Sequence, residues 1–153
     1  MFTVFDDKHF MKEALKQAQL AMDEDEIPVG AVVVSDNRII ARAHNNTEQL
    51  HDVTAHAEII AITAASDYLG SKYLKGCTLF VTLEPCLMCA GALRWSQIDR
   101  VVYAAPDEKH GFMRYGKGVL HPSTTLAYGI LQDESSRLLR TFFQNKRTID
   151  KLI

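Results

Sequence analysis

Apolar residues recur at helical spacing near both ends of the chain. Between His9 and Met22 the apolar positions share one face of a helix, and Asp6 or Asp7 can cap its start. The same spacing over residues 133–146 gives an apolar side made of Leu138, Leu139, Phe142 and Phe143. The pattern therefore predicts one helix in each of these stretches.

The middle of the chain alternates short β-branched runs with helical segments. Five segments are predicted to be strands: residues 29–34, 39–41, 77–82, 98–105 and 125–128. Two helices are predicted between them: residues 55–66, with Thr54 as N-cap, and residues 85–95, with Pro85 at the first position. Trp95, at the end of the second helix, is expected to pack in the core.

Strands that alternate with helices after an opening hairpin imply a mixed sheet with parallel crossovers. We therefore predict an α/β protein in which a mixed five-stranded sheet lies between two helical layers, a three-layer α/β/α fold. Functional side chains are expected at the carboxyl ends of its strands. No repeat, low-complexity segment or linker divides the chain, so residues 1–153 are expected to form a single domain.

Composition and the first residues favour a cytoplasmic protein. No apolar run approaches the roughly 20 residues that a membrane helix needs, so no membrane partner is expected. Asp6 and Asp7 lie where a signal peptide would carry a basic and then an apolar segment. Three cysteines, two of them in one short motif, argue against a disulfide framework and fit a reducing compartment.

The formal charge of −2 conceals an uneven distribution along the chain. Residues 6–26 hold seven acidic and three basic side chains, whereas residues 109–151 hold eight basic and three acidic ones. This basic part either faces a polyanion or is an ordinary solvated surface. Within it, residues 110–118 interleave cations and aromatic rings. That combination serves single-stranded RNA recognition, unless the rings fold inward.

Two short motifs supply the residues of a candidate metal site. His56 and Glu58 lie in one motif, and Cys86 and Cys89 lie about thirty residues further on. One imidazole and two thiolates are zinc ligands, and a set of three leaves a position for water, as in catalytic rather than structural zinc sites. Both motifs begin predicted helices, where the helix dipole favours a thiolate. The alternative is a redox module in which the two cysteines form a reversible disulfide.

These motifs resemble the zinc-dependent nucleoside deaminase signature, and their surroundings resemble the bacterial tRNA adenosine deaminase family. The resemblance rests on Pro28-Val29-Gly30-Ala31-Val32, Asn45, residues 54–58, residues 81–92 and the Phe142-Phe143 pair. It implies a cytidine-deaminase-like fold, a homodimer, and one zinc ion per subunit held by His56, Cys86 and Cys89. The implied reaction converts the wobble adenosine of a tRNA anticodon stem-loop to inosine.

The resemblance also implies roles for three further residues. Glu58 transfers protons while an activated water attacks C6 of the purine. Asn45 matches a position that contacts the target base, where an amide offers both a donor and an acceptor. Asp107 matches a position that contacts the nucleotide backbone. A zinc-dependent deaminase of a free base or nucleoside, such as guanine, cytosine or cytidine, stays open as an alternative because the metal motif does not identify the base.

Overall fold

The computed structural model describes residues 3–152 and contains one five-stranded sheet in the order β2-β1-β3-β4-β5. The strands are β1 (Gly30–Ser35), β2 (Arg38–His44), β3 (Cys77–Leu83), β4 (Arg100–Ala105) and β5 (Thr125–Tyr128). Strand β1 is antiparallel to both β2 and β3, whereas β3, β4 and β5 run parallel. The predicted mixed sheet is therefore confirmed.

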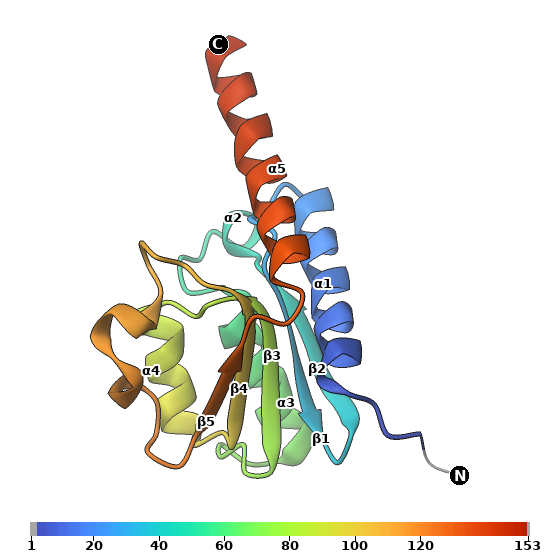
Figure 1. Ribbon diagram of the computed structural model, residues 1–153, viewed down its shortest axis with the longest axis vertical. Helices are drawn as coiled ribbons and strands as arrows, with labels where there is room; N and C mark the ends of the chain where they lie inside the picture. The colour runs from blue at the N-terminus through green and yellow to red at the C-terminus, as the bar shows by residue number, and fades with distance from the viewer. Residues whose placement is uncertain (1–2, 153) are drawn as a thin grey trace.

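Helices cover both faces of this sheet (Figure 1). They are α1 (Asp7–Asp23), α2 (Thr47–Leu50), α3 (Ala57–Leu69), α4 (Leu87–Ser96) and α5 (Gln132–Leu152). Helix α1 and the first part of α5 pack on one face, and α3 and α4 pack on the other. This arrangement is the predicted three-layer α/β/α fold.

Alternate residues of the central strands face the two helical layers. On β1, Val32 packs with Phe10 and Met11 of α1, whereas Val33 points to the layer of α3 and α4. Phe10 also meets Phe80 of β3, with ring centroids 5.3 Å apart. Full burial of such side chains contributes roughly 1.5–3 kcal/mol each, so the two apolar layers hold the sheet edge that carries the candidate site.

The starts of α3 and α4 differ from the predicted ones. His56, not Thr54, is the N-cap of α3, and Cys86 is the N-cap of α4, which leaves Pro85 outside the helix. Thr54 instead donates from its backbone N–H and its hydroxyl to Oδ1 of Asp52, at 2.8 and 2.7 Å. That local turn competes with capping by Thr54. One candidate metal ligand thus lies at the N-cap of each helix, His56 at α3 and Cys86 at α4.

Three further differences concern segments without a strong apolar period. Helix α2 was not expected, because it has only four residues, three of them polar, and none is buried. Helix α5 continues to Leu152, beyond the predicted end at residue 146, and its last turns project from the body of the molecule (Figure 1). Trp95 is not in the core but 82% exposed.

Within residues 3–152, no helix combines the length and apolar character required to cross a membrane.

Candidate active site

The candidate metal ligands converge where α3 and α4 begin. Nδ1 of His56 lies 3.7 Å from Sγ of Cys86 and 3.5 Å from Sγ of Cys89. One ligand atom from each residue lies within 4.8 Å of the others, which brings together all three predicted ligands. Two sulfur atoms and one imidazole nitrogen at these separations fit zinc, and the number of protein ligands fits a catalytic rather than a closed structural site.

The protonation of the two cysteines also fits a metal cation. The Cys89 thiol, and then the His56 imidazole, lower the pKa of Cys86 to about 4. The same contact with Cys86, together with burial, raises the pKa of Cys89, so the two sulfur atoms share a proton in the metal-free chain. A metal that takes the place of this proton finds one thiolate already formed.

Glu58 lies one residue beyond the start of α3 and is only 3% exposed. Burial raises the pKa of its carboxyl group to about 7. The positive charge of a bound zinc ion opposes this shift, because an adjacent cation favours the carboxylate. Burial and the cation thus act on the pKa of Glu58 in opposite directions, and a carboxyl group under both influences can accept and then donate a proton during one reaction cycle.

Asn45 connects the end of β2 to the start of α3. Its side-chain oxygen accepts a hydrogen bond of 2.8 Å from the backbone N–H of Ala57, the first residue of α3. This bond is a tertiary helix cap, and it explains why α3 needs no local capping side chain. The predicted pairing of Asn45 with a base therefore relies mainly on its amide nitrogen, since the oxygen already has a partner.

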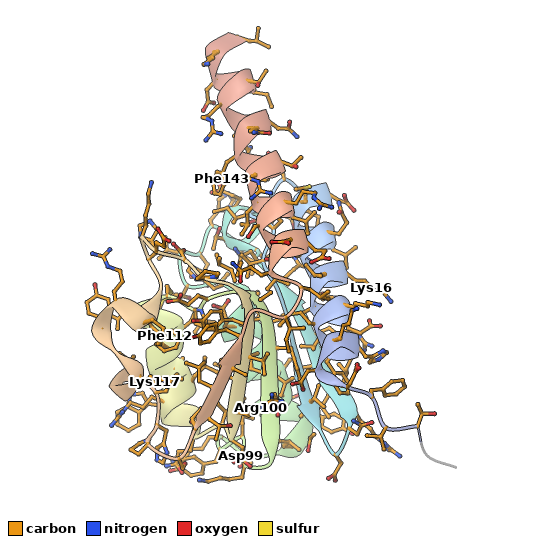
Figure 2. All side chains as sticks on the ribbon, in the orientation of Figure 1. Lys16, Asp99, Arg100, Phe112, Lys117 and Phe143 are labelled. Atoms are coloured by element: carbon orange, nitrogen blue, oxygen red, sulfur yellow. The ribbon has the colours of Figure 1, made fainter. Side chains whose placement is uncertain are left out.

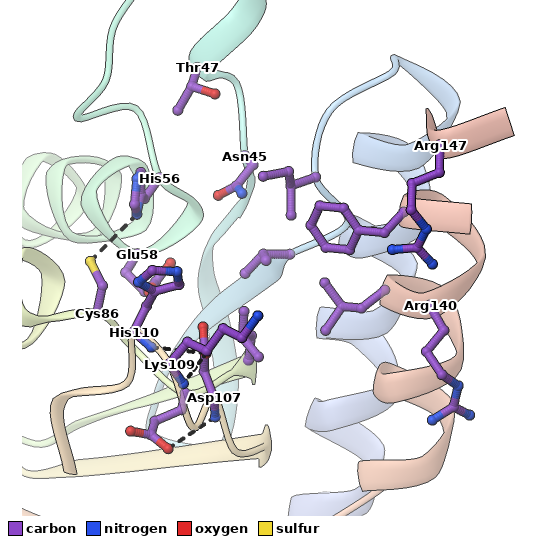
Figure 3. A pocket seen from close by; sticks show the side chains of 16 residues that line it. Asn45, Thr47, His56, Glu58, Cys86, Asp107, Lys109, His110, Arg140 and Arg147 are labelled. Atoms are coloured by element: carbon purple, nitrogen blue, oxygen red, sulfur yellow. Dashed lines mark hydrogen bonds between the residues drawn. The ribbon is translucent and has the colours of Figure 1, made fainter. Parts of the chain in front are cut away.

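A pocket of about 800 Å³ opens over these residues. Asn45, His56, Glu58 and Cys86 form its floor (Figure 3). Two walls rise from other elements: Asp107, Lys109 and His110, which follow β4, and one side of α5. The pocket thus has room for a base together with its sugar.

The wall after β4 contains Asp107, whose carboxylate is engaged within its own loop. Oδ1 accepts hydrogen bonds of 3.1 Å from the backbone N–H groups of both Lys109 and His110. Asp107, Lys109 and His110 all line the pocket, so the structure places Asp107 beside the metal group, and its contact with a nucleotide stays a prediction. Its main contacts in the described residues nevertheless support the loop.

Residues 110–118 divide into an inward and an outward part. Two short 3-10 helices, η1 (Phe112–Tyr115) and η2 (Lys117–Val119), replace the expected loop. Phe112 (Figure 2) is fully buried, with its ring centroid 6.4 Å from that of Tyr103. Tyr115 is 63% exposed. Only part of this segment is therefore available to a nucleic acid.

The wall on α5 was not among the predicted site residues. It consists of Leu139, Arg140, Phe143 and Arg147. Leu139, Phe143 and Arg147 are spaced by four residues and so share one face of the helix. That spacing was visible in the sequence, but nothing in it indicated that this face would lie over the metal group.

A model of the cytidine and deoxycytidylate deaminase zinc-binding region matches residues 5–105. The chain belongs to this deaminase family. Zinc is therefore the cofactor, and His56, Cys86 and Cys89 form the group that can hold it. The match ends with β4 and leaves the two pocket walls outside.

The similarity to curated proteins covers nearly the whole length of this deaminase. It is 45% identical to the tRNA-specific adenosine deaminase of Agrobacterium fabrum, across 93% of this chain and 97% of that protein. It is 44% identical to the tRNA-specific adenosine deaminase of Aquifex aeolicus, across 92% and 95%.

Solved structures give the same fold from two kinds of deaminase. A structure from a study of A-to-I editing by tRNA:A34 deaminases matches with a TM-score of 0.81 and 43% identity, covering 86% of this chain and 99% of that one. A guanine deaminase from Nitrosomonas europaea matches with a TM-score of 0.83 and 26% identity, covering 92% and 86%. The backbone alone does not separate these two activities, whereas the sequence identity favours the first.

Proposed function

We propose that this protein deaminates adenosine to inosine at the wobble position of a tRNA anticodon. The observation that carries the proposal is the position of the metal group and Glu58 at the floor of a pocket with cationic and aromatic walls. A base must leave the stacked loop to reach this floor, which costs a few kcal/mol. Lys109, Arg140 and Arg147 can offset that cost at phosphates, and the Phe143 ring can stack on a base.

In the proposed mechanism the protein holds the base and moves protons. Zinc, when bound by His56, Cys86 and Cys89, lowers the pKa of a water molecule toward neutrality. Glu58 accepts one proton from that water and returns it to the ring nitrogen, and then transfers the second proton from the new C6 hydroxyl to the departing amine. The water oxygen bonds to C6, the C6–N bond breaks, and the products are inosine and ammonia. His56 cannot share the proton transfer while its nitrogen is a metal ligand.

Asn45 and Asp107 are proposed to bind the nucleotide. The amide nitrogen of Asn45 donates a hydrogen bond to the purine edge, because its oxygen already caps α3. Asp107 repels phosphate through its own charge, so we assign it to a sugar hydroxyl, which can donate to the carboxylate oxygen that the loop leaves free. The 2′-hydroxyl distinguishes RNA from DNA at such a contact.

We also propose a homodimer of single-domain subunits that acts in the cytoplasm. Met88 and Trp95 are seven residues apart on α4, so they share a face, and Leu87 lies next to it. Their side chains are 38%, 82% and 47% exposed, which is unusual for a short helix with large apolar residues. Sedimentation of the protein and of Trp95→Lys tests the dimer: dissociation in the variant supports it, and a monomeric wild type contradicts it.

The test of the activity is mass spectrometry of nucleosides from an arginine tRNA with adenosine at the wobble position. Zinc-loaded wild type is expected to form inosine, and Glu58→Ala is not. Free guanine, cytosine and cytidine are incubated in parallel, because the guanine deaminase shares this backbone. Conversion of a free base without inosine in the tRNA would contradict the proposed function and favour that alternative.

A further inference from the structure

Two buried glutamates, Glu84 in the lining of the pocket and Glu26 outside that lining, take no part in the proposed chemistry. Glu26 is 1% exposed and Glu84 is 6% exposed. In residues 3–152, the ion pairs involve other carboxylates, so neither glutamate is neutralised by a lysine, arginine or histidine. A buried carboxylate without a cation must be stabilised by hydrogen-bond donors, and the donors it selects indicate its role.

Glu26 binds the start of α2. Its Oε1 accepts hydrogen bonds of 2.9 Å from the backbone N–H groups of Glu48 and Gln49, and its Oε2 accepts one of 3.4 Å from the Thr47 hydroxyl. Asn46, the local N-cap, provides no side-chain bond to the helix. A carboxylate 22 residues away therefore caps α2 in its place. This segment begins at Asn45, and both Asn45 and Thr47 line the pocket.

Glu84 binds the wall that follows β4. Its Oε1 accepts a hydrogen bond of 3.2 Å from the backbone N–H of Asp107, and its Oε2 accepts one of 3.1 Å from that of Met113. A Cβ atom at Gly111 would overlap the Glu84 carboxylate, so the backbone can approach it only because this residue is glycine. The carboxylate thus binds the first and the last residue of segment 107–113, which carries Lys109 and His110, through one hydrogen bond each.

We propose that Glu26 and Glu84 are positioning residues for the deamination, each of which holds one side of the substrate pocket at a set place relative to the metal group. Neither contacts the reacting atoms. Glu26 acts through Asn45 and Thr47, and Glu84 acts through Asp107, Lys109 and His110. The proposal rests on the proposed function insofar as its kinetic test measures inosine.

The two glutamates bind their donors differently, and this difference makes the glutamine variants informative. Each carboxylate oxygen of Glu84 accepts a hydrogen bond from one backbone N–H group. Glu84→Gln replaces one of these oxygens by an amide nitrogen, a donor that would face another N–H donor. In Glu26 the two shortest bonds share Oε1. Glu26→Gln can keep both, and its amide can donate to the Thr47 hydroxyl; it loses only the longer bond of 3.3 Å that Oε2 accepts from the Glu48 N–H. Glutamine should therefore damage position 84 more than position 26.

The kinetic test compares zinc-loaded variants on the tRNA substrate at a temperature where all are folded. We expect Glu84→Gln to lower kcat/KM about tenfold to a hundredfold, mainly through KM, because an unsatisfied buried group disturbs the binding wall. Glu26→Ala should lose about tenfold and Glu26→Gln several-fold less. Glu108→Gln is the matched control, an exposed carboxylate in the same loop. A lower melting temperature with unchanged KM in Glu84→Gln would overturn the proposal, since that is the signature of a purely structural role.

A double variant tests whether Glu84 acts through its contact with the loop. Gly111→Ala displaces the same carboxylate and also crowds the Asp107 carbonyl oxygen. Because the contact with Glu84 is then already broken, Glu84→Gln combined with Gly111→Ala should be no worse than Gly111→Ala alone. Fold losses that multiply in the double variant would show that the two residues act independently and would contradict the proposed contact.

Amide hydrogen exchange tests the positioning without any substrate. Exchange in residues 107–113 should be faster in Glu84→Gln and unchanged in Glu108→Gln, and exchange in residues 46–50 should be faster in Glu26→Ala. Unchanged exchange in Glu84→Gln would overturn its role whatever the substrate is. If wild type forms no inosine while these exchange differences appear, the proposed function is wrong and the positioning role stands.

Discussion

The floor and the walls of the pocket differ in how much of each is set by local sequence. On the floor, Cys86 and Cys89 are three residues apart on α4, and His56 and Glu58 are two apart at the start of α3. The walls depend on side chains far away in the chain: Glu84 holds residues 107–113, and α5 returns from the end of the chain. Each pair of floor residues is therefore set by one helix start, but the two pairs are 30 residues apart in the chain and meet only in the folded sheet, so the floor as a whole needs the assembled fold as each wall does.

This difference separates the chemistry from the choice of substrate. The same floor can serve a free base or a nucleotide in RNA, because zinc chemistry does not depend on what surrounds the base. The walls provide the cations, the aromatic ring and the shape that select a partner. Changes on the floor should therefore abolish turnover, and changes in the walls should weaken binding or stability.

The largest effect is expected on the floor, where two neighbouring residues should fail in different ways. Glu58→Ala should keep zinc and lower kcat by about 10²–10⁴, since it removes the proton carrier. His56→Ala should lose zinc, because it removes a ligand. Metal analysis of the purified variants and single-turnover kinetics check both, with Glu58→Gln as an isosteric control. Substantial turnover by Glu58→Ala would contradict the assignment.

The wall after β4 should lose stability when Phe112, its side chain in the core, is truncated. Phe112 is fully buried, so Phe112→Ala should lower the free energy of unfolding by about 3–5 kcal/mol. Tyr115→Ala, on the exposed side of the same 3-10 helix, should change it by less than about 0.5 kcal/mol. Urea unfolding of the two variants measures the difference. Equal losses would show that this wall is not anchored through Phe112.

The wall on α5 should affect binding rather than chemistry. Phe143→Ala should weaken binding to the tRNA by about 1–3 kcal/mol if its ring stacks on a base, with little change in zinc content. Ile149→Ala is the matched control, because Ile149 is exposed on the same helix but lies outside the pocket. Fluorescence anisotropy with a labelled anticodon stem-loop measures both. Similar losses in the two variants would contradict a specific role for Phe143.

The smallest effect concerns the start of α1, remote from the pocket. Arg100 binds both carboxylate oxygens of Asp7, at 2.8 and 2.7 Å, and holds the pKa of Asp7 below its ordinary value of 3.8. A lowered carboxyl pKa in the folded protein contributes stability above the unfolded pKa, and this contribution is lost as the pH falls through the folded value. Because the pair is partly exposed, Asp7→Asn should cost about 0.5–1 kcal/mol at pH 7 and progressively less below pH 4. Urea unfolding at both pH values checks the trend, and a cost that grows on acidification would contradict it.

The amino-acid sequence by itself determined the layered fold and the floor of the pocket. Alternation along β1, helical spacing in α1 and the spacing of Cys86 and Cys89 are local properties, so they are visible without coordinates. The resemblance to known deaminases added the role of Glu58. Local patterns failed where the deciding contact comes from a distant residue. Asn45 caps α3, which starts after His56, and Glu26 caps α2, which the local sequence did not predict.

Only the tertiary structure decided what surrounds the metal group. Phe112 turns inward while Tyr115 stays exposed, although both belong to the same interleaved stretch. Trp95 lies outside the core, and the face of α5 that carries Phe143 lies over the pocket. The physical reason is range. Helical and strand periods are set by neighbouring residues, whereas a wall is placed by hydrogen bonds and packing between segments whose separation in the sequence carries no periodic signal.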